Sequence, residues 1–239
     1  MQLLTLMTEK YAIIVAGGVG NRAGGSVPKQ FRNLCGIPML WWSVRAFHQE
    51  NPETKIILVL NSAYVGLWNE LYESLPSEDR SIAVTVTSGG DSRLESVWNG
   101  LKCVPDSGGS LVAVHDAARP LITTDIIRRG WEAASQSGAA VPVAPLVDSI
   151  RHISDAGNFS VPRKEYVRVQ TPQVFDSESL KRAYDRPFSP DLTDDASVVE
   201  AAGYKITLFD GSDYNLKVTA PNDFAIAETL LNQFQASPS

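Results

Sequence analysis

Residues 11–31 read YAIIVAGGVGNRAGGSVPKQF, and the fold follows from this stretch. Its first five residues form a continuous apolar run that glycines bring to an end, which is typical of a buried strand in a parallel sheet. The glycines of the loop that follows include Gly17, Gly18 and Gly20. Because glycine has no Cβ, the N–H groups of this loop can surround anionic oxygens, and Arg22 and Lys29 add positive charge. The stretch therefore predicts a site for a triphosphate.

The same loop also fits a dinucleotide-binding fingerprint, since residues 18–23 match G-x-G-x-x-A. That match leaves an NAD(P)-dependent oxidoreductase as an alternative. The fingerprint normally opens a helix and is followed about 20 residues later by an acidic residue. Here Gly24, Gly25 and Pro28 interrupt any helix, and the next predicted strand ends at Asn61. A P-loop is excluded because no Gly-Lys-Ser/Thr follows the glycines.

The composition narrows the class of protein. A chain of 239 residues is long enough for one large α/β domain with a substantial core. The net charge of −6 provides no basic field for a nucleic-acid backbone, which argues against a nucleic-acid partner. No apolar run is long enough to span a membrane, and Cys35 and Cys103 lack metal-ligand spacing. We therefore expect a cytoplasmic protein with free thiols and no membrane partner.

Apolar runs and helical patterns alternate along most of the chain. The predicted strands are 11–15, 55–60, 82–87, 111–114, 139–143, 205–209 and a short one at 215–219. The predicted helices begin near residues 38, 63, 91, 123, 177, 194 and 222. This alternation predicts right-handed βαβ crossovers and an α/β fold with a Rossmann-like, mostly parallel sheet flanked by helices.

A second glycine turn, SGGDSRLESV at residues 88–97, follows the predicted strand 82–87 and opens a helix. Asp91 is placed to cap the N-terminus of that helix, and Ser96 lies one turn further on. Backbone N–H groups and the Ser96 hydroxyl would then face the same sheet edge as the first loop. A well-formed helix start without a ligand is the alternative for this segment.

Charged residues follow the predicted strand 111–114. Asp116 stands at the carboxyl end of a central strand, where open α/β sheets place their ligands. Mg²⁺ takes one or two carboxylates together with phosphates and water, so Asp116 is a candidate ligand for a Mg²⁺ ion that bridges phosphate oxygens. Arg119 would clamp an anionic second substrate. His115 ends a buried strand, and we interpret it as a hydrogen-bonded structural residue rather than a base.

A β-arm is predicted as an insertion at about 146–171 in a single domain that spans residues 1–239. The segment lacks a helical period and reads as two strands, 146–151 and 166–170, around a turn at 155–158. An isolated two-stranded arm is barely stable in water, so we expect this one to pack on a second subunit. Its basic stretch makes Arg163 the preferred substrate contact, with a solvated basic loop as the alternative.

Seven motifs lie in order along the chain: A-G-G-x-G-x-R…P-K-Q-F, G-G-D-x-R-x-x-S-V, H-D-A-A-R-P, V-P-R, Q-T-P-Q, T-D-D-A-S and N-L-K-V-T-x-P. As an ordered set they resemble the family of 2-C-methyl-D-erythritol 4-phosphate cytidylyltransferases, enzymes of non-mevalonate isoprenoid synthesis, over residues 11–231. The first motif indicates only the wider sugar-nucleotide transferase group, whereas the six later ones together are specific to this branch.

The resemblance implies Mg²⁺-dependent transfer of a cytidylyl group from CTP to the polyol phosphate, giving 4-diphosphocytidyl-2-C-methyl-D-erythritol and pyrophosphate. It implies a homodimer with shared active sites, in which Arg163 reaches the partner's substrate. The implied catalytic residues are Arg22, Lys29, Arg163 and Lys217. The implied nucleotide contacts are Ala16, Gly17, Gly18, Gly20, Gly90, Asp91, Ser96 and Ala117. The implied substrate contacts are Asp116, Arg119, Arg163, Thr193 and Lys217, with Asp116 also supporting the metal.

Two positions depart from the family pattern. Ser149 replaces the usual threonine and keeps its hydroxyl, whereas Tyr214 stands where some members carry an acidic residue that binds the substrate. Tyr214 is shared with the related ribitol 5-phosphate cytidylyltransferases, so that activity remains an alternative. A non-catalytic nucleotide-binding scaffold is a further alternative. Four charged residues that it would be free to lose argue against it: Arg22, Lys29, Asp116 and Lys217.

Overall fold

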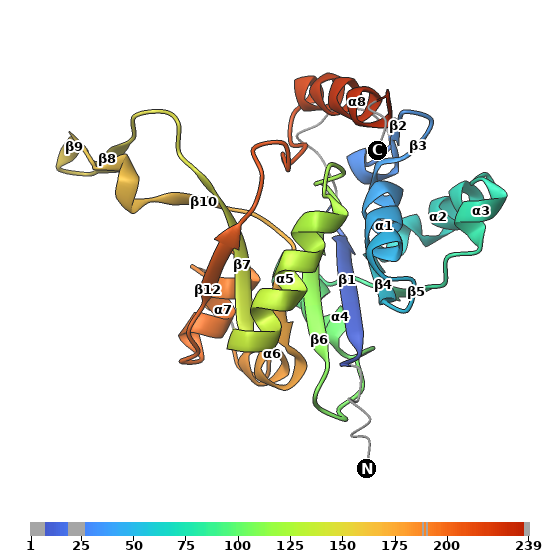
Figure 1. Cartoon of the computed structure of the whole chain (residues 1–239), viewed down its shortest axis with the longest axis horizontal. Helices are drawn as coiled ribbons and strands as arrows, with labels where there is room; N and C mark the ends of the chain where they lie inside the picture. The colour runs from blue at the N-terminus through green and yellow to red at the C-terminus, as the bar shows by residue number, and fades with distance from the viewer. Residues whose placement is uncertain (1–7, 19–26, 188, 190, 237–239) are drawn as a thin grey trace, which may run out of the picture.

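The computed structural model describes residues 8–18, 27–187, 189 and 191–236. One sheet lies at its centre, with the strand order β10-β7-β11-β6-β1-β4-β5 and with β12 paired to β7 (Figure 1). Its strands are β1 (Lys10–Ala16), β4 (Lys55–Leu60), β5 (Val84–Ser88), β6 (Leu111–Asp116), β7 (Ala139–Pro145), β10 (Val167–Val169), β11 (Gln173–Asp176) and β12 (Thr207–Asp210).

The predicted mostly parallel α/β sheet is confirmed, with one addition. Strands β1, β4, β5 and β6 pair in parallel, and so do β7 and β12. However, β11 lies antiparallel between β6 and β7 and separates them, a strand that the sequence pattern did not predict. It has only four residues, which are too few to show a period after Pro172.

Helices cover both faces of the sheet. The helices are α1 (Met39–Glu50), α2 (Val65–Glu73), α3 (Ser77–Arg80), α4 (Arg93–Leu101), α5 (Thr124–Ser137), α6 (Ser177–Tyr184), α7 (Asp195–Ala201) and α8 (Pro221–Ala236). Within β1, Ala12 and Ile14 pack on the α1 and α5 side, while Tyr11 and Ile13 pack on the α4 and α6 side. Both faces of the strand are buried, which explains its unbroken apolar run.

Short elements follow strands β1 and β4. They are the 3₁₀ helices η2 (Lys29–Phe31) and η3 (Ser62–Tyr64) and the small hairpin β2 (Asn33–Leu34) and β3 (Ile37–Pro38). The predicted strand at 215–219 is not formed, although the Val218 amide donates to the Ala118 carbonyl at 2.8 Å. A third apolar cluster holds Val218 beneath Phe224 and Leu231 of α8. Packing therefore fixes this segment without strand pairing.

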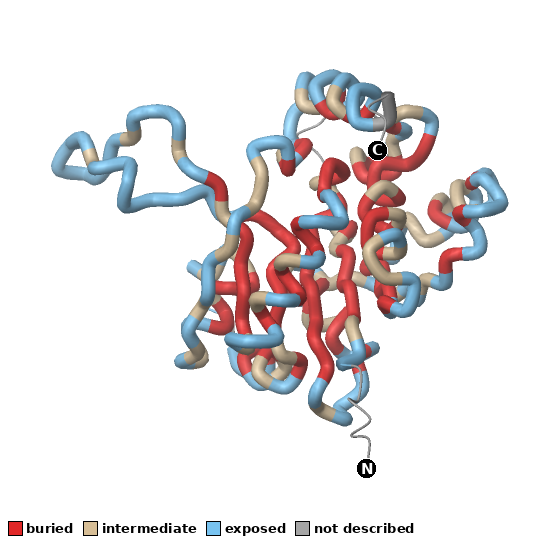
Figure 2. The backbone as a smooth tube through the Cα atoms, in the orientation of Figure 1, coloured by how far each residue is buried: buried red, intermediate tan, exposed pale blue. Residues whose placement is uncertain are grey.

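The arm leaves the body between β7 and β10 and ends in a hairpin of β8 (Arg151–Ser154) and β9 (Gly157–Ser160). The predicted turn near Asp155 is confirmed, but the predicted strand at 146–151 is wrong, since only its last residue belongs to a strand. The strand predicted at 166–170 forms as β10, yet it pairs antiparallel with β7 because the open edge of the main sheet offers it backbone partners. Most of the arm is exposed (Figure 2), including the 3₁₀ helix η4 (Arg163–Glu165). In the described part of the chain, no helix is long and apolar enough to cross a membrane.

Candidate active site

A pocket of about 610 Å³ opens at the carboxyl edge of the sheet. It gathers the end of β1, the turn after β5, the end of β6 and the segment before α8. Of the residues predicted for the site, those that line it are Ala16, Gly17, Gly18, Lys29, Gly90, Asp91, Ser96, Asp116, Ala117 and Lys217. Gly20 and Arg22 lie outside the described residues. The pocket thus brings together residues from the beginning and the end of the chain.

The start of the glycine loop is held by Gln30, which is 3% exposed and lines the pocket. Its Nε2 donates to the carbonyls of Ala16 and Gly18 at 2.8 and 2.7 Å. Both carbonyl oxygens are thereby engaged by the protein. A Cβ on Gly17 would come within 2.9 Å of the Ser96 hydroxyl, so a side chain at that position would displace a neighbouring wall of the pocket.

The second turn forms the wall opposite β1. The cap of α4 is Ser92, not Asp91 as predicted, because Ser92 and Glu95 form a reciprocal capping box. The Asp91 amide donates to the Glu95 carboxylate at 2.7 Å, and the exposed residue sits on the pocket rim. The buried Ser96 hydroxyl accepts from the Gly90 amide at 3.1 Å and donates to the Ser92 carbonyl at 2.9 Å. This wall is therefore rigid.

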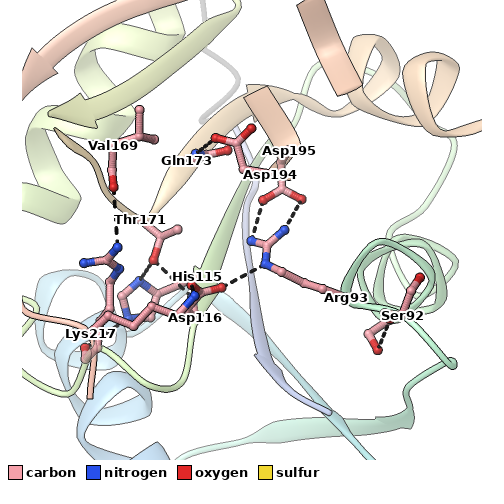
Figure 3. Close-up of polar contacts among 12 residues, drawn as sticks. Ser92, Arg93, His115, Asp116, Val169, Thr171, Gln173, Asp194, Asp195 and Lys217 are labelled. Carbon is pink, nitrogen blue, oxygen red and sulfur yellow. Dashed lines mark hydrogen bonds and ion pairs between the residues drawn. The ribbon is translucent and has the colours of Figure 1, made fainter. Parts of the chain in front are cut away.

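Asp116 is the charged centre of the pocket (Figure 3). Its Oδ1 accepts from Arg93 Nε at 3.0 Å, and its Oδ2 accepts from Lys217 Nζ at 2.7 Å. Burial would raise the pKa of this carboxyl, but the charges of Arg93 and Lys217, with a smaller contribution from Arg119, hold it far below its usual range. Asp116 is therefore ionised at neutral pH and fixed by a cation on each oxygen.

Lys29 reaches the same pocket from η2. Its Nζ donates to the Val218 carbonyl at 2.7 Å, next to the residue whose side chain contacts Asp116. The segment before α8 therefore positions both lysines, one through its own side chain and one through a backbone oxygen. Asp223 in the first turn of α8 accepts from the amides of Thr219 and Ala220, which ties that segment to the helix.

His115 has no access to the pocket. It is 0% exposed, its Nε2 faces the Arg119 carbonyl at 3.3 Å, and its Nδ1 faces the Thr171 hydroxyl at 3.1 Å. Since a carbonyl only accepts, the proton is on Nε2, and Thr171 donates to Nδ1 while accepting from the Asp116 amide at 3.1 Å. Burial lowers the pKa of His115 to about 4. These contacts support the structural interpretation of this histidine.

Three predicted residues do not line this chain's pocket. Arg119 donates to the carbonyl of Asn215 at 2.7 Å and supports the segment behind Lys217. Thr193 is exposed just before α7, and Arg163 lies on the arm, where it donates to the Val147 carbonyl. These three residues therefore lie outside the lining of this chain's pocket.

The pocket offers a metal few protein ligands. Among the described residues, no cluster of three or more histidine, cysteine, aspartate or glutamate side chains could hold an ion. Asp116 supplies one carboxylate whose oxygens are already bound by two cations. A single carboxylate fits Mg²⁺ when nucleotide phosphates and water complete the octahedron. The donor set thus suits an ion that is held jointly with a triphosphate.

A sequence model of the 2-C-methyl-D-erythritol 4-phosphate cytidylyltransferase family matches residues 11–233. The chain belongs to this family. A family member from Bacteroides thetaiotaomicron is 45% identical over 223 residues, which cover 93% of this chain and all of the relative. Another, from Porphyromonas gingivalis strain W83, is 42% identical and covers 93% of this chain and 98% of the relative.

Solved structures agree with the sequence comparison. The crystal structure of the cytidylyltransferase from Thermus thermophilus is 30% identical with a TM-score of 0.72, covering 95% of this chain and all of that one. That from Francisella tularensis is 27% identical with a TM-score of 0.75, covering 93% and 99%. The resemblance inferred from the motifs is confirmed, and this cytidylyltransferase is not an NAD(P)-dependent oxidoreductase.

The sequence reasoning missed several residues of the cytidylyltransferase site. Arg93 lies in the motif G-G-D-x-R and Gln30 in P-K-Q-F, but neither motif by itself indicates which residues they contact. A polar residue inside a motif is a usable signal for both. Asp195 lies in T-D-D-A-S and Thr171 in Q-T-P-Q, so both carry the same kind of signal, whereas Tyr184 lies in none of the motifs. The contacts that these three residues make come from segments that only the fold brings together.

Proposed function

We propose that this cytidylyltransferase carries out its reaction in the pocket at the carboxyl edge of the sheet. A phosphate oxygen of 2-C-methyl-D-erythritol 4-phosphate attacks the α-phosphorus of CTP, a new O–P bond forms, and the bond to the β-phosphate oxygen breaks so that pyrophosphate leaves in line. A phosphate monoester is already anionic near neutral pH, so no general base is required. The observation that carries the proposal is the convergence of Lys29, Asp116 and Lys217 beside the glycine loop.

Catalysis would consist of positioning and electrostatic stabilisation. The N–H groups of Gly17, Gly18 and Gly20 would surround the triphosphate. Lys29 and Arg22 would stabilise the charge that develops on the α-phosphoryl group. Lys217, already fixed against Asp116 at 2.7 Å, would hold the attacking phosphate in line. The remaining nucleotide contacts that we propose are Ala16, Gly90, Asp91, Ser96 and Ala117.

Asp116 would hold Mg²⁺, which when bound would supply positive charge to neutralise the triphosphate. Because both carboxylate oxygens accept from cations in the free protein, we expect the metal to bind jointly with the nucleotide. This expectation is tested by calorimetric titration of the protein with Mg²⁺, first alone and then in the presence of CTP. Tight binding of Mg²⁺ without CTP would contradict it.

We further propose that the enzyme is a homodimer whose arm completes the partner's site. The arm exposes Val147, Ile153 and Phe159 to the extent of 73%, 80% and 56%. Apolar side chains on a hairpin that cannot support itself gain most when another subunit covers them. Arg163 lies on the same arm and outside its own pocket, which suits a role in the partner's site. Arg119 and Thr193 would contact the substrate in their own subunit's site.

A subunit-mixing experiment tests the shared site. Lys29→Ala chains and Arg163→Ala chains are each expected to be nearly inactive. Mixed and re-associated, they form heterodimers in which one of the two sites keeps both residues, so about a quarter of wild-type activity should return. A fully active monomer in light scattering, or no recovery in heterodimers shown to form, would overturn the proposal.

The polyol phosphate can be tested directly by incubating the enzyme with CTP, Mg²⁺ and each sugar phosphate and measuring pyrophosphate. We expect release with 2-C-methyl-D-erythritol 4-phosphate and little with ribitol 5-phosphate. Tyr214, which raised the ribitol alternative, does not line the pocket and packs edge-to-face on Phe234 at 5.8 Å. No observation therefore favours that alternative.

We also propose that the chain is a single domain and works in the cytoplasm.

A further inference from the structure

Arg93 joins two carboxylates that come from different elements, Asp116 at the end of β6 and Asp195 at the start of α7 (Figure 3). Its Nε donates to Asp116 at 3.0 Å, while Nη1 and Nη2 donate to the two oxygens of Asp195 at 3.2 and 2.7 Å. One planar guanidinium therefore spans three carboxylate oxygens. A lysine has a single nitrogen and cannot reproduce this arrangement.

Asp195 contacts the pocket through Arg93. It lies in the first turn of α7, is 0% exposed and is not among the residues that line the pocket. The Tyr184 hydroxyl donates to its Oδ1 at 2.5 Å, and Tyr184 is also buried outside the pocket. A buried carboxylate is costly unless charges and donors surround it. These two residues therefore provide a fixed anchor for the far end of Arg93.

The other end of Arg93 decides how Asp116 is oriented. The χ2 torsion of an aspartate is broad, so a carboxylate held on one oxygen only can rotate. Here Arg93 holds Oδ1, which leaves Oδ2 directed at Lys217. The Thr171 hydroxyl fixes the backbone of the same residue. Arg93 thus restricts the last free torsion of Asp116.

We propose that Arg93 is a positioning residue for cytidylyl transfer, anchored by Asp195 and Tyr184, and that it acts by orienting Asp116 toward Lys217. The inference rests on the proposed roles of Asp116 and Lys217. It also links the segment that carries Thr193 to the nucleotide pocket, because Asp195 follows Thr193 by two residues. Gln173 braces the same helix start from β11, donating to Asp194 at 2.7 Å and accepting from the Ala196 amide at 2.8 Å.

The first test separates charge from geometry at residue 93. Arg93→Gln should lower kcat about 10–100-fold, the usual cost of losing an outer partner of a functional carboxylate. Arg93→Lys keeps the charge and should recover little of that loss, because it cannot bridge both carboxylates. The dissociation constant for CTP, measured by calorimetry, should stay within about threefold of wild type. An active Arg93→Lys enzyme would overturn the proposal.

The second test acts at a distance from the substrates. Tyr184→Phe removes one donor to Asp195, changes no charge and leaves the pocket lining intact, so kcat should fall about threefold to tenfold with little change in KM for CTP. The matched control is Tyr72→Phe, which removes a hydroxyl bound to the Arg80 carbonyl on the α2 side of the molecule and should keep wild-type kcat. Equal kcat values for both variants would contradict the proposal.

A double variant addresses folding. Arg93→Gln combined with Asp195→Asn leaves no unpaired buried charge, so a folded enzyme is expected by circular dichroism and thermal melting. Because the two residues act as a unit, its kcat should match that of Arg93→Gln alone rather than fall by both losses. A kcat that returns to wild type in this variant would show that Arg93 matters only for folding.

Two further outcomes are distinguishable. A raised CTP dissociation constant with unchanged kcat would make Arg93 a simple wall of the nucleotide pocket and would overturn the positioning role. Lys217→Ala, measured in parallel, tests the underlying site: if it keeps full activity, the proposed function of the pocket is wrong. Loss of activity in Lys217→Ala with normal Arg93 and Tyr184 variants would refute the positioning role alone.

Discussion

Around Arg93, the buried carboxylates of Asp116 and Asp195 are each paired with a charged donor, whereas along the arm apolar side chains stand in solvent. Asp195 is 0% exposed and is bound by Arg93 and Tyr184, while Ile153 at the tip of the arm is 80% exposed. Charges can be buried only where partners are already built around them. Exposed apolar groups gain stability only when another surface covers them. The comparison teaches that the charged centre is assembled by one chain, whereas the arm is suited to a contact between chains.

The largest expected effect is on the chemistry of the pocket. Lys29→Ala should lower kcat by about 10²–10³, comparable with the loss of an oxyanion donor, because it removes charge next to the reacting phosphoryl group. Steady-state kinetics with varied CTP measures it. Lys102→Ala, which removes an exposed lysine near Trp98 outside the pocket, is the matched control and should be normal. If Lys29→Ala changes only KM, the proposed stabilisation of the transition state is wrong.

The next effect concerns the free energy of unfolding, to which the buried residue His115 contributes. Burial lowers the pKa of His115 from 6.5 to about 4, so between these values the unfolded chain binds a proton that the folded chain does not. Stability present above pH 6.5 should therefore be lost as the pH falls toward 4, by about 3 kcal/mol from this residue. Urea unfolding at several pH values measures the slope, which should be shallower in His115→Gln. An identical slope in that variant would exclude His115 as the cause.

A smaller effect is expected at the start of α4, the helix that carries Arg93. Ser92→Ala removes a cap and should cost about 1 kcal/mol of unfolding free energy. Thr123→Ala removes the cap of α5, away from the pocket, and should cost a similar amount. Only the Ser92 variant should also raise KM for CTP, because the cap holds the turn that forms the pocket wall. Equal kinetics in the two variants would show that the wall does not depend on it.

The smallest effect on the stability of the body is expected on the arm. Ile153→Ser combined with Phe159→Ser should leave the unfolding free energy of the separated chain within about 0.5 kcal/mol of wild type, because both side chains are exposed. The same change should weaken self-association, as measured by light scattering over a dilution series. A large loss of monomer stability with unchanged association would contradict the conclusion that the arm serves a contact between chains.

The predictable parts of the fold are those that depend on local pattern. The runs at 11–15 and 55–60 carry no polar interruption, and both became strands buried on both faces. The missed strand β11 and the unexpected pairing of β10 share one cause. Each consists of three or four residues whose pairing depends on which neighbouring edge is available, and this is a property of the assembled sheet.

The order of the motifs along the chain identifies the family, and the residue pattern predicts the mostly parallel α/β class and the place of the glycine loop and Lys29 at the pocket. These features depend on residue types and on their order along the chain, which any folded state must respect. The contacts of Asp116 with Arg93 and Lys217, 23 and 101 positions away, and the support from Asp195 and Tyr184 could be seen in the folded structure alone. Charge pairing in a buried site depends on distances between segments, and only packing sets those distances.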